Sequence, residues 1–265
     1  MKNKKLLAAG CSMTDKNFYS WDNSLNEDER GSWPMWPEII ASNLAMPVIN
    51  LGKSGSANKE IFDSVYDKIQ LDKNIGLVIV VWSAWDRFKR MALIDEFPLT
   101  SLSQYMLSDH KKFLSLSQLP EYTKFFESLN KGEMSLYSKD CINSSLRYMF
   151  MLAQALKEKN IPYVFFQGVN NFPIAMTQDI ESVVSYYEED IIKDLNSSIY
   201  HNPIKKDRNI VGFPFFTFLG GFRLDELTWK NDHLTVSDRD RHPNAEGQQV
   251  IAKYIMDKYN ELYSS

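Results

Sequence analysis

The sequence predicts an α/β protein in three layers, in which helices cover both faces of a mostly parallel central sheet. Two observations support this fold class. Short apolar runs alternate along the chain with segments of helical periodicity, as βα units require. One run, residues 77–82, is continuously apolar and rich in β-branched residues, which is typical of a strand covered on both faces. With 265 residues and 44% hydrophobic side chains, the chain can bury the core of one large domain.

Four short apolar runs are predicted as strands. Each is short for a helix and contains hydrophobic residues in succession. The first directly follows the basic N-terminus, and the third has the strongest signal. In chain order the predicted strands span residues 5–9, 47–51, 77–82 and 162–166.

Apolar residues that recur every three or four positions predict the helices. Pro37 is suited to the first turn of a helix, where its missing N–H is not needed. Asn58 is a suitable N-cap for the next helix, whose apolar stripe runs to Ile69. The predicted helices are residues 37–44, the segment from Asn58 past Ile69, residues 140–159, about 180–195, and 244–262.

The chain is expected to form a single domain, residues 1–265. The periodic pattern is interrupted over about residues 89–136 and 172–215, which we interpret as two insertions of helices and loops. Neither a sequence repeat nor a linker rich in glycine, serine or proline is found. Long segments of this kind in a compact domain often shape the binding site.

Composition and charge exclude several classes of partner. The formal net charge is −4, with acidic and basic residues mixed along the chain, so we expect neither nucleic acid nor membrane as a partner. The apolar run Leu6 to Gly10 is too short for an export signal, and Ile75 to Trp85 is too short to span a bilayer. Two cysteines are too few for a disulfide framework, so a cytoplasmic location is expected.

Several familiar motifs fail when their spacing is counted. A phosphate-binding loop ending in Gly52-Lys53-Ser54 would need a glycine at position 47, which is Pro47. The nucleophile-elbow pattern G-x-S-x-G is absent. No metal site and no cofactor are expected, because the four histidines lack the spacings typical of zinc ligands: His110, His201, His233 and His242.

Two segments at opposite ends of the chain carry the residue types of nucleophilic catalysis. Ser12 lies just beyond the first predicted strand, where open α/β sheets place their sites. His242 lies among acidic residues in the loop before the last helix. A serine becomes nucleophilic when an adjacent base takes its proton, and a carboxylate orients that base.

These segments resemble sequence blocks of the SGNH/GDSL hydrolase family. Gly10-Cys11-Ser12-Met13 is similar to the first block, although Cys11 replaces the family's aspartate. The segment from Asn50 to Asn58 resembles the second block, and Val81 to Arg87 occupies the place of the third. The run His242-Pro243-Asn244, followed by Ala-x-Gly, closely resembles the last block. The resemblance implies a flavodoxin-like α/β/α fold.

The resemblance also implies roles for individual residues. Ser12 would be the nucleophile and His242 the base, and the backbone N–H groups of Ser12 and Gly55 would form the oxyanion hole. The family's oxyanion asparagine is missing, and Ser83 is the nearest substitute by position. The usual place of the acid, three residues before the histidine, is Arg239.

The residue that orients His242 is therefore open at the level of sequence. Asp240 is the first choice, and Asp238 is the alternative. A Ser-His dyad steadied by a backbone carbonyl is a third arrangement. Trp85 and Asn58 are expected to contact the substrate, because ligand pockets favour aromatic linings and both residues belong to the matched blocks.

The function implied is hydrolysis of a carboxylic ester through an acyl-enzyme, with a small molecule or an acylated carbohydrate such as an O-acetyl sugar as substrate. Two alternatives are open. The missing asparagine is compatible with a carbohydrate-binding or scaffold protein that has lost turnover, and an O-acyltransferase would use the same serine. The sequence carries no indication of the oligomeric state.

Overall fold

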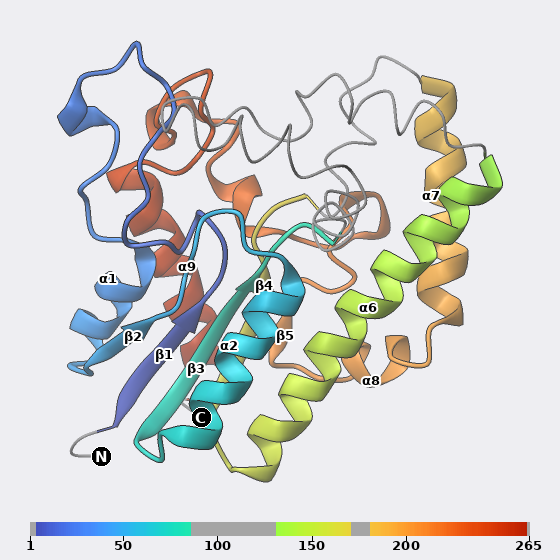
Figure 1. Cartoon of the computed structure of the whole chain (residues 1–265), viewed down its shortest axis with the longest axis horizontal. Coiled ribbons are helices and arrows are strands. Elements are labelled where there is room, and N and C mark those ends of the chain that lie inside the picture. Colours follow the sequence, from blue (N-terminus) through green and yellow to red (C-terminus); the bar gives the residue numbers. More distant parts are fainter. Residues whose placement is uncertain (1–3, 86–130, 171–180, 264–265) are drawn as a thin grey trace, which may run out of the picture.

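The computed structural model describes residues 4–85, 131–170 and 181–263 (Figure 1). Their strands form one sheet in which all neighbours are parallel, in the order β2-β1-β3-β4-β5. The strands are β1 (Lys5–Ala9), β2 (Val48–Asn50), β3 (Ile75–Trp82), β4 (Tyr163–Gln167) and β5 (Ile210–Val211). The predicted α/β class with a parallel central sheet is confirmed.

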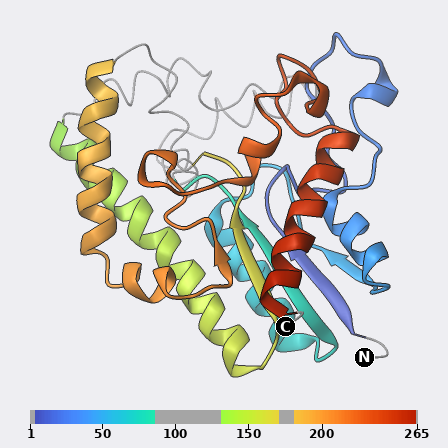
Figure 2. The ribbon, with the colours of Figure 1, turned by 180° about the vertical axis from the view of Figure 1, so that it is seen from behind.

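Helices cover both faces of this sheet. Helices α1 and α9 lie over one face (Figure 2), and α2 and α6 lie over the other (Figure 1). Helices α7 and α8 pack against α6. Their bounds are α1 (Trp36–Asn43), α2 (Asn58–Leu71), α6 (Lys131–Glu158), α7 (Glu181–Ser197), α8 (His201–Lys205) and α9 (Ala245–Tyr263).

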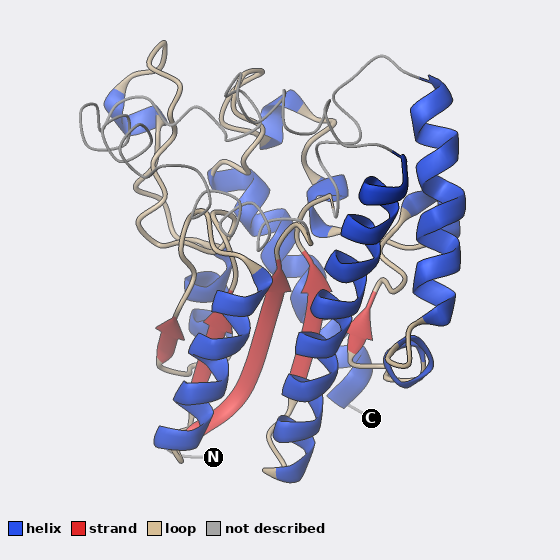
Figure 3. Ribbon diagram, turned by 45° about the vertical axis from the view of Figure 1, so that its right-hand side comes forward, coloured by secondary structure: helices blue, strands red, loops and turns tan. Residues whose placement is uncertain are grey.

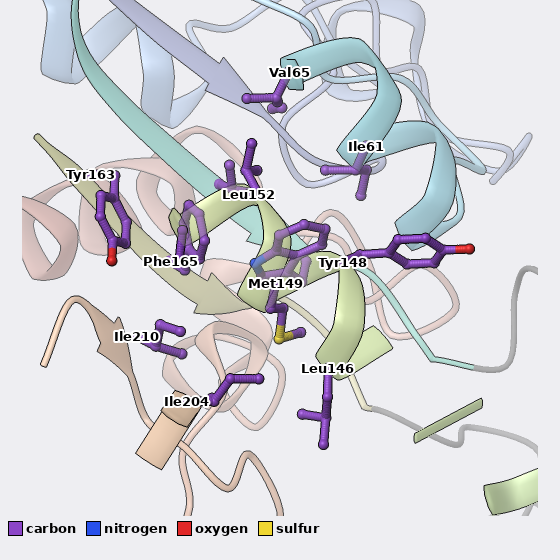
Figure 4. Close-up of a cluster of buried hydrophobic side chains, with 14 of the residues drawn as sticks. Ile61, Val65, Leu146, Tyr148, Met149, Leu152, Tyr163, Phe165, Ile204 and Ile210 are labelled. Carbon is purple, nitrogen blue, oxygen red and sulfur yellow. The ribbon is translucent and has the colours of Figure 1, made fainter. Parts of the chain in front are cut away.

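The alternation of side chains along β3 divides the core into two layers. Val78, Val80 and Trp82 belong to the cluster beneath α2 and α6, and the intervening residues pack under α1 and α9. Figure 4 shows the first cluster, in which Met149 and Leu152 of α6 lie close to strand residues. Because β3 is buried on both faces, its continuous apolar run needs no polar alternation.

The strand order changes direction at β1, so the switch point of the sheet lies between β1 and β3. Successive strands extend the sheet in one direction from β1 to β2 and in the other from β1 through β3 to β5. In such open sheets, ligands bind outside the carboxyl ends of the strands at this switch point. Figure 3 shows the strand arrows pointing toward a common edge, where the loops after β1 and β3 emerge.

The two expected insertions lie only partly within the described residues. Residues 89–130 and 172–180 lie outside them, and residues 131–136 are the start of α6. The second expected insertion contains α7, α8 and β5, and β5 is a strand of the sheet. A strand of two residues, Ile210–Val211, is too short to produce a periodic pattern, which explains why the sequence did not reveal it. No described helix is both long and apolar enough to cross a membrane.

Candidate active site

Ser12 lies in a tight turn at the end of β1. The backbone N–H groups of Thr14 and Asp15 both donate to the carbonyl oxygen of Cys11, at 2.9 and 3.2 Å. The turn requires glycine at position 10, since a Cβ atom there would lie 2.2 Å from Thr14 Oγ1 and 2.9 Å from the carbonyl oxygen of Val81. Ser12 is 7% exposed, so the residue is largely enclosed by protein atoms.

His242 lies in a short loop that is closed by its own backbone. The N–H of Val236 donates to the carbonyl oxygen of His242 at 2.9 Å, and that of Ser237 donates to the carbonyl oxygen of Asp240 at 3.1 Å. Asn244 fixes the end of the loop, because its Oδ1 accepts from the Gly247 N–H in the first turn of α9 at 3.0 Å. The loop therefore presents the His242 side chain from a rigid base.

The structure brings Ser12, His242 and Asp240 into one hydrogen-bonded chain. His242 Nε2 lies 2.7 Å from Ser12 Oγ, and His242 Nδ1 lies 2.5 Å from Asp240 Oδ1. Since a carboxylate only accepts, Nδ1 carries the ring proton of the neutral imidazole and Nε2 is left to accept the serine proton. This is the arrangement that makes a serine hydroxyl nucleophilic.

Asp240 is ionised despite its burial. Its side chain is 1% exposed, and burial by itself raises the pKa of this carboxyl. The hydrogen bonds and charge of His242, together with the Ser20 hydroxyl, outweigh burial and hold the pKa of Asp240 below its ordinary value. The Ser20 hydroxyl donates to Asp240 Oδ2 at 2.5 Å. An ionised acid at this place stabilises the imidazolium that forms when His242 takes a proton.

The geometry separates the three arrangements left open by the sequence. Asp238 is exposed, and its carboxylate makes no hydrogen bond to the His242 ring. The Nδ1 position is occupied by the Asp240 carboxylate, so it does not face a backbone carbonyl. Asp240 reaches the ring from two residues away because its Oδ1 also accepts the His242 backbone N–H, at 3.2 Å.

Phe18 packs on the imidazole and is a site residue that the sequence did not indicate. The centroids of the Phe18 and His242 rings lie 4.7 Å apart at an interplanar angle of 37°. The Phe18 ring limits access of water to one side of the imidazole and restricts its rotation. Phe18 lies in the segment after the Ser12 turn, which has no motif, so only its position in space identifies it.

The backbone N–H groups of Ser12 and Gly55 are the predicted donors to an oxyanion. Within the described residues, neither the Ser12 N–H nor the Gly55 N–H donates to a protein acceptor. Gly55 has a φ of +83°, which favours glycine, and an added Cβ would meet open space. The loop before it is held by Asp15, whose Oδ2 accepts from both the N–H and the hydroxyl of Ser54, each at 2.8 Å.

Ser83, the expected third oxyanion donor, is enclosed. It is 0% exposed, and its hydroxyl has no hydrogen-bond partner in the described part of the chain. Its backbone N–H donates to Asn58 Oδ1 at 2.8 Å. A hydroxyl closed off in this way does not face a substrate, so the structure does not give Ser83 the position that the sequence suggested.

Asn58 and Trp85, which were expected to contact the substrate, are both buried and hydrogen-bond to other protein groups. Asn58 Nδ2 donates to the carbonyl oxygen of Ser83 and to Ser145 Oγ, both at 3.2 Å, so Asn58 ties the ends of β3 and α2 to α6. Nor does its side chain cap α2, whose N-cap position is Ala57. Trp85 is 2% exposed, and its indole N–H donates to Gln167 Oε1 at 3.1 Å. Both side chains turn inward to satisfy buried hydrogen bonds.

No group of three or more potential metal ligands of the His, Cys, Asp or Glu type occurs among the described residues. The described site brings together a serine hydroxyl, an imidazole and a carboxylate in one hydrogen-bonded chain. This combination suits acyl transfer.

The fold aligns with solved structures over nearly its whole length. One is a protein from Desulfitobacterium hafniense DCB-2 assigned to the G-D-S-L family of lipolytic proteins (13% identity, TM-score 0.45, covering 97% of this chain and 99% of the other). Another is an α/β hydrolase from the metagenome of Lake Arreo, Spain (14% identity, TM-score 0.40, covering 97% of this chain and 95% of the other). A third is a catalytic mutant of Axe2, an acetylxylan esterase from Geobacillus stearothermophilus (14% identity, TM-score 0.40, covering 97% of this chain and 94% of the other). No protein-family model and no curated protein matches the sequence.

Proposed function

We propose that this protein is a serine hydrolase that cleaves a carboxylic ester through an acyl-enzyme. The observation that carries the proposal is the hydrogen-bonded chain from Ser12 Oγ through the His242 ring to the Asp240 carboxylate. The 2.7 Å between Ser12 Oγ and His242 Nε2 lies within the hydrogen-bond reach that proton transfer requires, and the 2.5 Å between His242 Nδ1 and Asp240 Oδ1 is shorter still. A structural serine and histidine would not need an ionised, buried carboxylate behind the ring.

In the first half of the reaction, Ser12 Oγ attacks the ester carbonyl carbon while His242 Nε2 takes the hydroxyl proton. The carbonyl oxygen gains the negative charge of the tetrahedral intermediate, and the N–H groups of Ser12 and Gly55 supply its donors. The intermediate collapses when His242 returns the proton to the leaving alcohol. The acyl group is then bound to Ser12 through an ester.

In the second half, water replaces the alcohol. His242 Nε2 takes a proton from water as the water oxygen attacks the acyl carbon, and the same two N–H groups meet the second oxyanion. Collapse expels Ser12 Oγ, which regains its proton from His242, and releases the carboxylic acid. Asp240 remains ionised throughout and stabilises each imidazolium.

The substrate class is a small ester that is uncharged or weakly charged. The chain has a net charge of −4 without a basic field, which does not favour a polyanion. An O-acetylated carbohydrate belongs to this class and is a suitable member for a substrate screen. An acyltransferase would form the same acyl-enzyme, and the product distinguishes it, because hydrolysis releases free acid without any acceptor other than water.

The experiment combines an activity-based probe with a chromogenic ester. The wild-type protein, Ser12→Ala and His242→Ala are incubated with a fluorophosphonate, the adduct is mapped by mass spectrometry, and hydrolysis of p-nitrophenyl acetate is followed. Ser64→Ala and His233→Ala are matched controls, because the Ser64 hydroxyl on α2 donates to the Ile61 carbonyl and the His233 side chain is exposed.

We expect an adduct on Ser12 in the wild type and both controls, and none in Ser12→Ala. We expect kcat/KM to fall by on the order of 10³-fold or more in Ser12→Ala and His242→Ala. Labelling that persists in Ser12→Ala, or a wild-type protein that neither reacts with the probe nor releases acid from any ester, would overturn the proposal.

A further inference from the structure

Four residues from opposite ends of the chain form a closed ring of hydrogen bonds behind the Asp240 carboxylate. The Ser20 hydroxyl donates to Asp240 Oδ2 at 2.5 Å, and the Asp240 N–H donates to Ser237 Oγ at 3.0 Å. The Ser237 hydroxyl donates to Asp22 Oδ2 at 2.7 Å, and the Asp22 N–H donates to Ser20 Oγ at 3.1 Å. The ring joins the segment around residues 20–22 to the loop that carries His242.

The ring has a single direction. Because a carboxylate and a backbone N–H each have only one role, the Ser20 hydroxyl must accept from Asp22 and donate to Asp240. In the same way, Ser237 must accept from Asp240 and donate to Asp22. The two bonds that share a serine hydroxyl polarise one another, so the bond that Ser20 accepts strengthens the bond that it donates to Asp240.

The ring is shielded and anchored. Ser20 is 0% exposed, Asp22 is 2% exposed and Asp240 is 2% exposed. The Ser20 backbone is fixed as well, since its N–H donates to the Arg30 carbonyl at 2.6 Å and its own carbonyl accepts from Arg30 Nη2 at 2.7 Å. Ser20 therefore reaches Asp240 from a rigid support.

We propose that Ser20 is a positioning residue for the reaction, which fixes the rotation of the Asp240 carboxylate so that Oδ1 faces His242 Nδ1. The inference rests on the proposed function, because it assigns Ser20 a role in the same proton transfer. Asp240 Oδ1 accepts from His242 and Oδ2 accepts from Ser20, so the two oxygens are held from opposite sides. Ser237 and Asp22 complete the support by holding the Asp240 backbone.

The test uses Ser20→Ala, with Ser237→Ala as a second variant at a less buried member of the ring. Ser198→Ala is the matched control, because Ser198 is a buried serine between α7 and α8, away from the ring. Two readouts are measured: kcat and KM for p-nitrophenyl acetate, and the proton NMR signal of the His242 Nδ1–H, which a strong hydrogen bond moves far downfield. Unfolding by urea checks that each variant is folded.

We expect Ser20→Ala to lower kcat about tenfold with little change in KM, as the loss of one hydrogen bond to a charged group predicts. We expect its Nδ1 proton signal to move upfield, and Ser237→Ala to change both readouts in the same direction by less. Ser198→Ala should match the wild type.

A folded Ser20→Ala with wild-type kcat and an unchanged Nδ1 signal would overturn the inference. A wild-type protein without hydrolase activity would overturn the proposed function instead. In that case the NMR comparison of wild type and Ser20→Ala still decides whether Ser20 orients the Asp240–His242 pair. An unchanged signal rejects the orienting role, and an upfield shift supports it.

Discussion

Asp15 binds Ser54 through two hydrogen bonds to a single carboxylate oxygen, one from the Ser54 N–H and one from its hydroxyl, each at 2.8 Å. This contact joins the turn that carries Ser12 to the loop that carries Gly55. The two N–H groups proposed to meet the oxyanion are therefore held relative to one another by a charged side chain. Asp15 is 8% exposed, so water competes little for this contact.

Replacing Asp15 with alanine should loosen the Gly55 loop without removing any group that takes part in the proton transfer. We expect Asp15→Ala to lower kcat for p-nitrophenyl acetate by about tenfold, less than the 10² to 10³ typical of deleting an oxyanion donor outright. Steady-state kinetics check this, with Asp63→Ala on the half-exposed face of α2 as control. An unchanged kcat in a folded Asp15→Ala protein would show that the loop holds its shape without the carboxylate.

Asp240 and Asp238 provide a matched pair of carboxylates two residues apart. Asp240→Asn keeps the shape but cannot stabilise the imidazolium and favours the wrong tautomer of His242, so kcat should fall by about 10³-fold or more. Asp238 is exposed and does not contact the ring, so Asp238→Asn should retain activity. Comparison of kcat for the two variants checks the assignment, and the reverse order of effects would transfer the role to Asp238.

The Phe18 ring packs on the imidazole with a centroid separation of 4.7 Å. An aromatic face favours the imidazolium that forms in the transition state. Packing against Phe18 also keeps the His242 ring in the rotation that faces Ser12 and Asp240. Phe18→Leu should therefore lower kcat by about three- to tenfold while the Ser12 adduct with the fluorophosphonate still forms, more slowly. The second-order labelling rate measures this, and a rate equal to that of the wild type would remove Phe18 from the site.

Removal of the Ser83 hydroxyl should leave activity intact. The hydroxyl is buried and has no partner within the described residues, so its desolvation is uncompensated. We expect Ser83→Ala to keep the wild-type kcat and to raise the free energy of unfolding by up to about 1 kcal/mol. Urea denaturation and ester hydrolysis provide the two measurements. A fall in kcat of about a hundredfold would instead assign the hydroxyl to the oxyanion hole.

Asp22 should make the stability of the protein depend on acidity. Hydrogen bonds from Ser24 and then Ser237 lower the pKa of Asp22 to about 2. Because the pKa is lower in the folded state than in the unfolded state, the stabilisation is complete above the unfolded value of 3.8 and is lost as the pH falls toward 2. Asp22→Asn should therefore be less stable than the wild type at about pH 5, and the difference should shrink at about pH 3.

Urea unfolding at the two pH values checks this expectation, with Asp67→Asn on the exposed face of α2 as control. The stability difference between the wild type and the control should change little with pH over this range. A gap between wild type and Asp22→Asn that stays constant from about pH 5 to about pH 3 would contradict the role of the Asp22 hydrogen bonds.

Local patterns along the chain encode the strands, the helices and part of the site. The apolar run of β3 and the short run of β1 specify strands because their side chains must be buried on both faces. The turn after β1 and the loop before α9 specify where Ser12 and His242 lie, since both are bounded by strong helix or strand signals. These signals were enough to predict the fold class, Ser12 and His242, with Asp240 as the first choice of two acids for the third member of the hydrogen-bonded chain.

The groups that complete the site depend on how distant segments pack together. Asp238 and Asp240 differ little in sequence context, and the choice between them depends on the direction in which the closed loop turns each side chain. Ser20 and Asp240 are 220 residues apart in the chain, so no local pattern records their contact. Trp85, within a matched block, is buried, and Gln167 on β4 accepts its N–H. Hydrogen-bond partners of this kind are set by the packing of whole elements, which spacing along the chain does not determine.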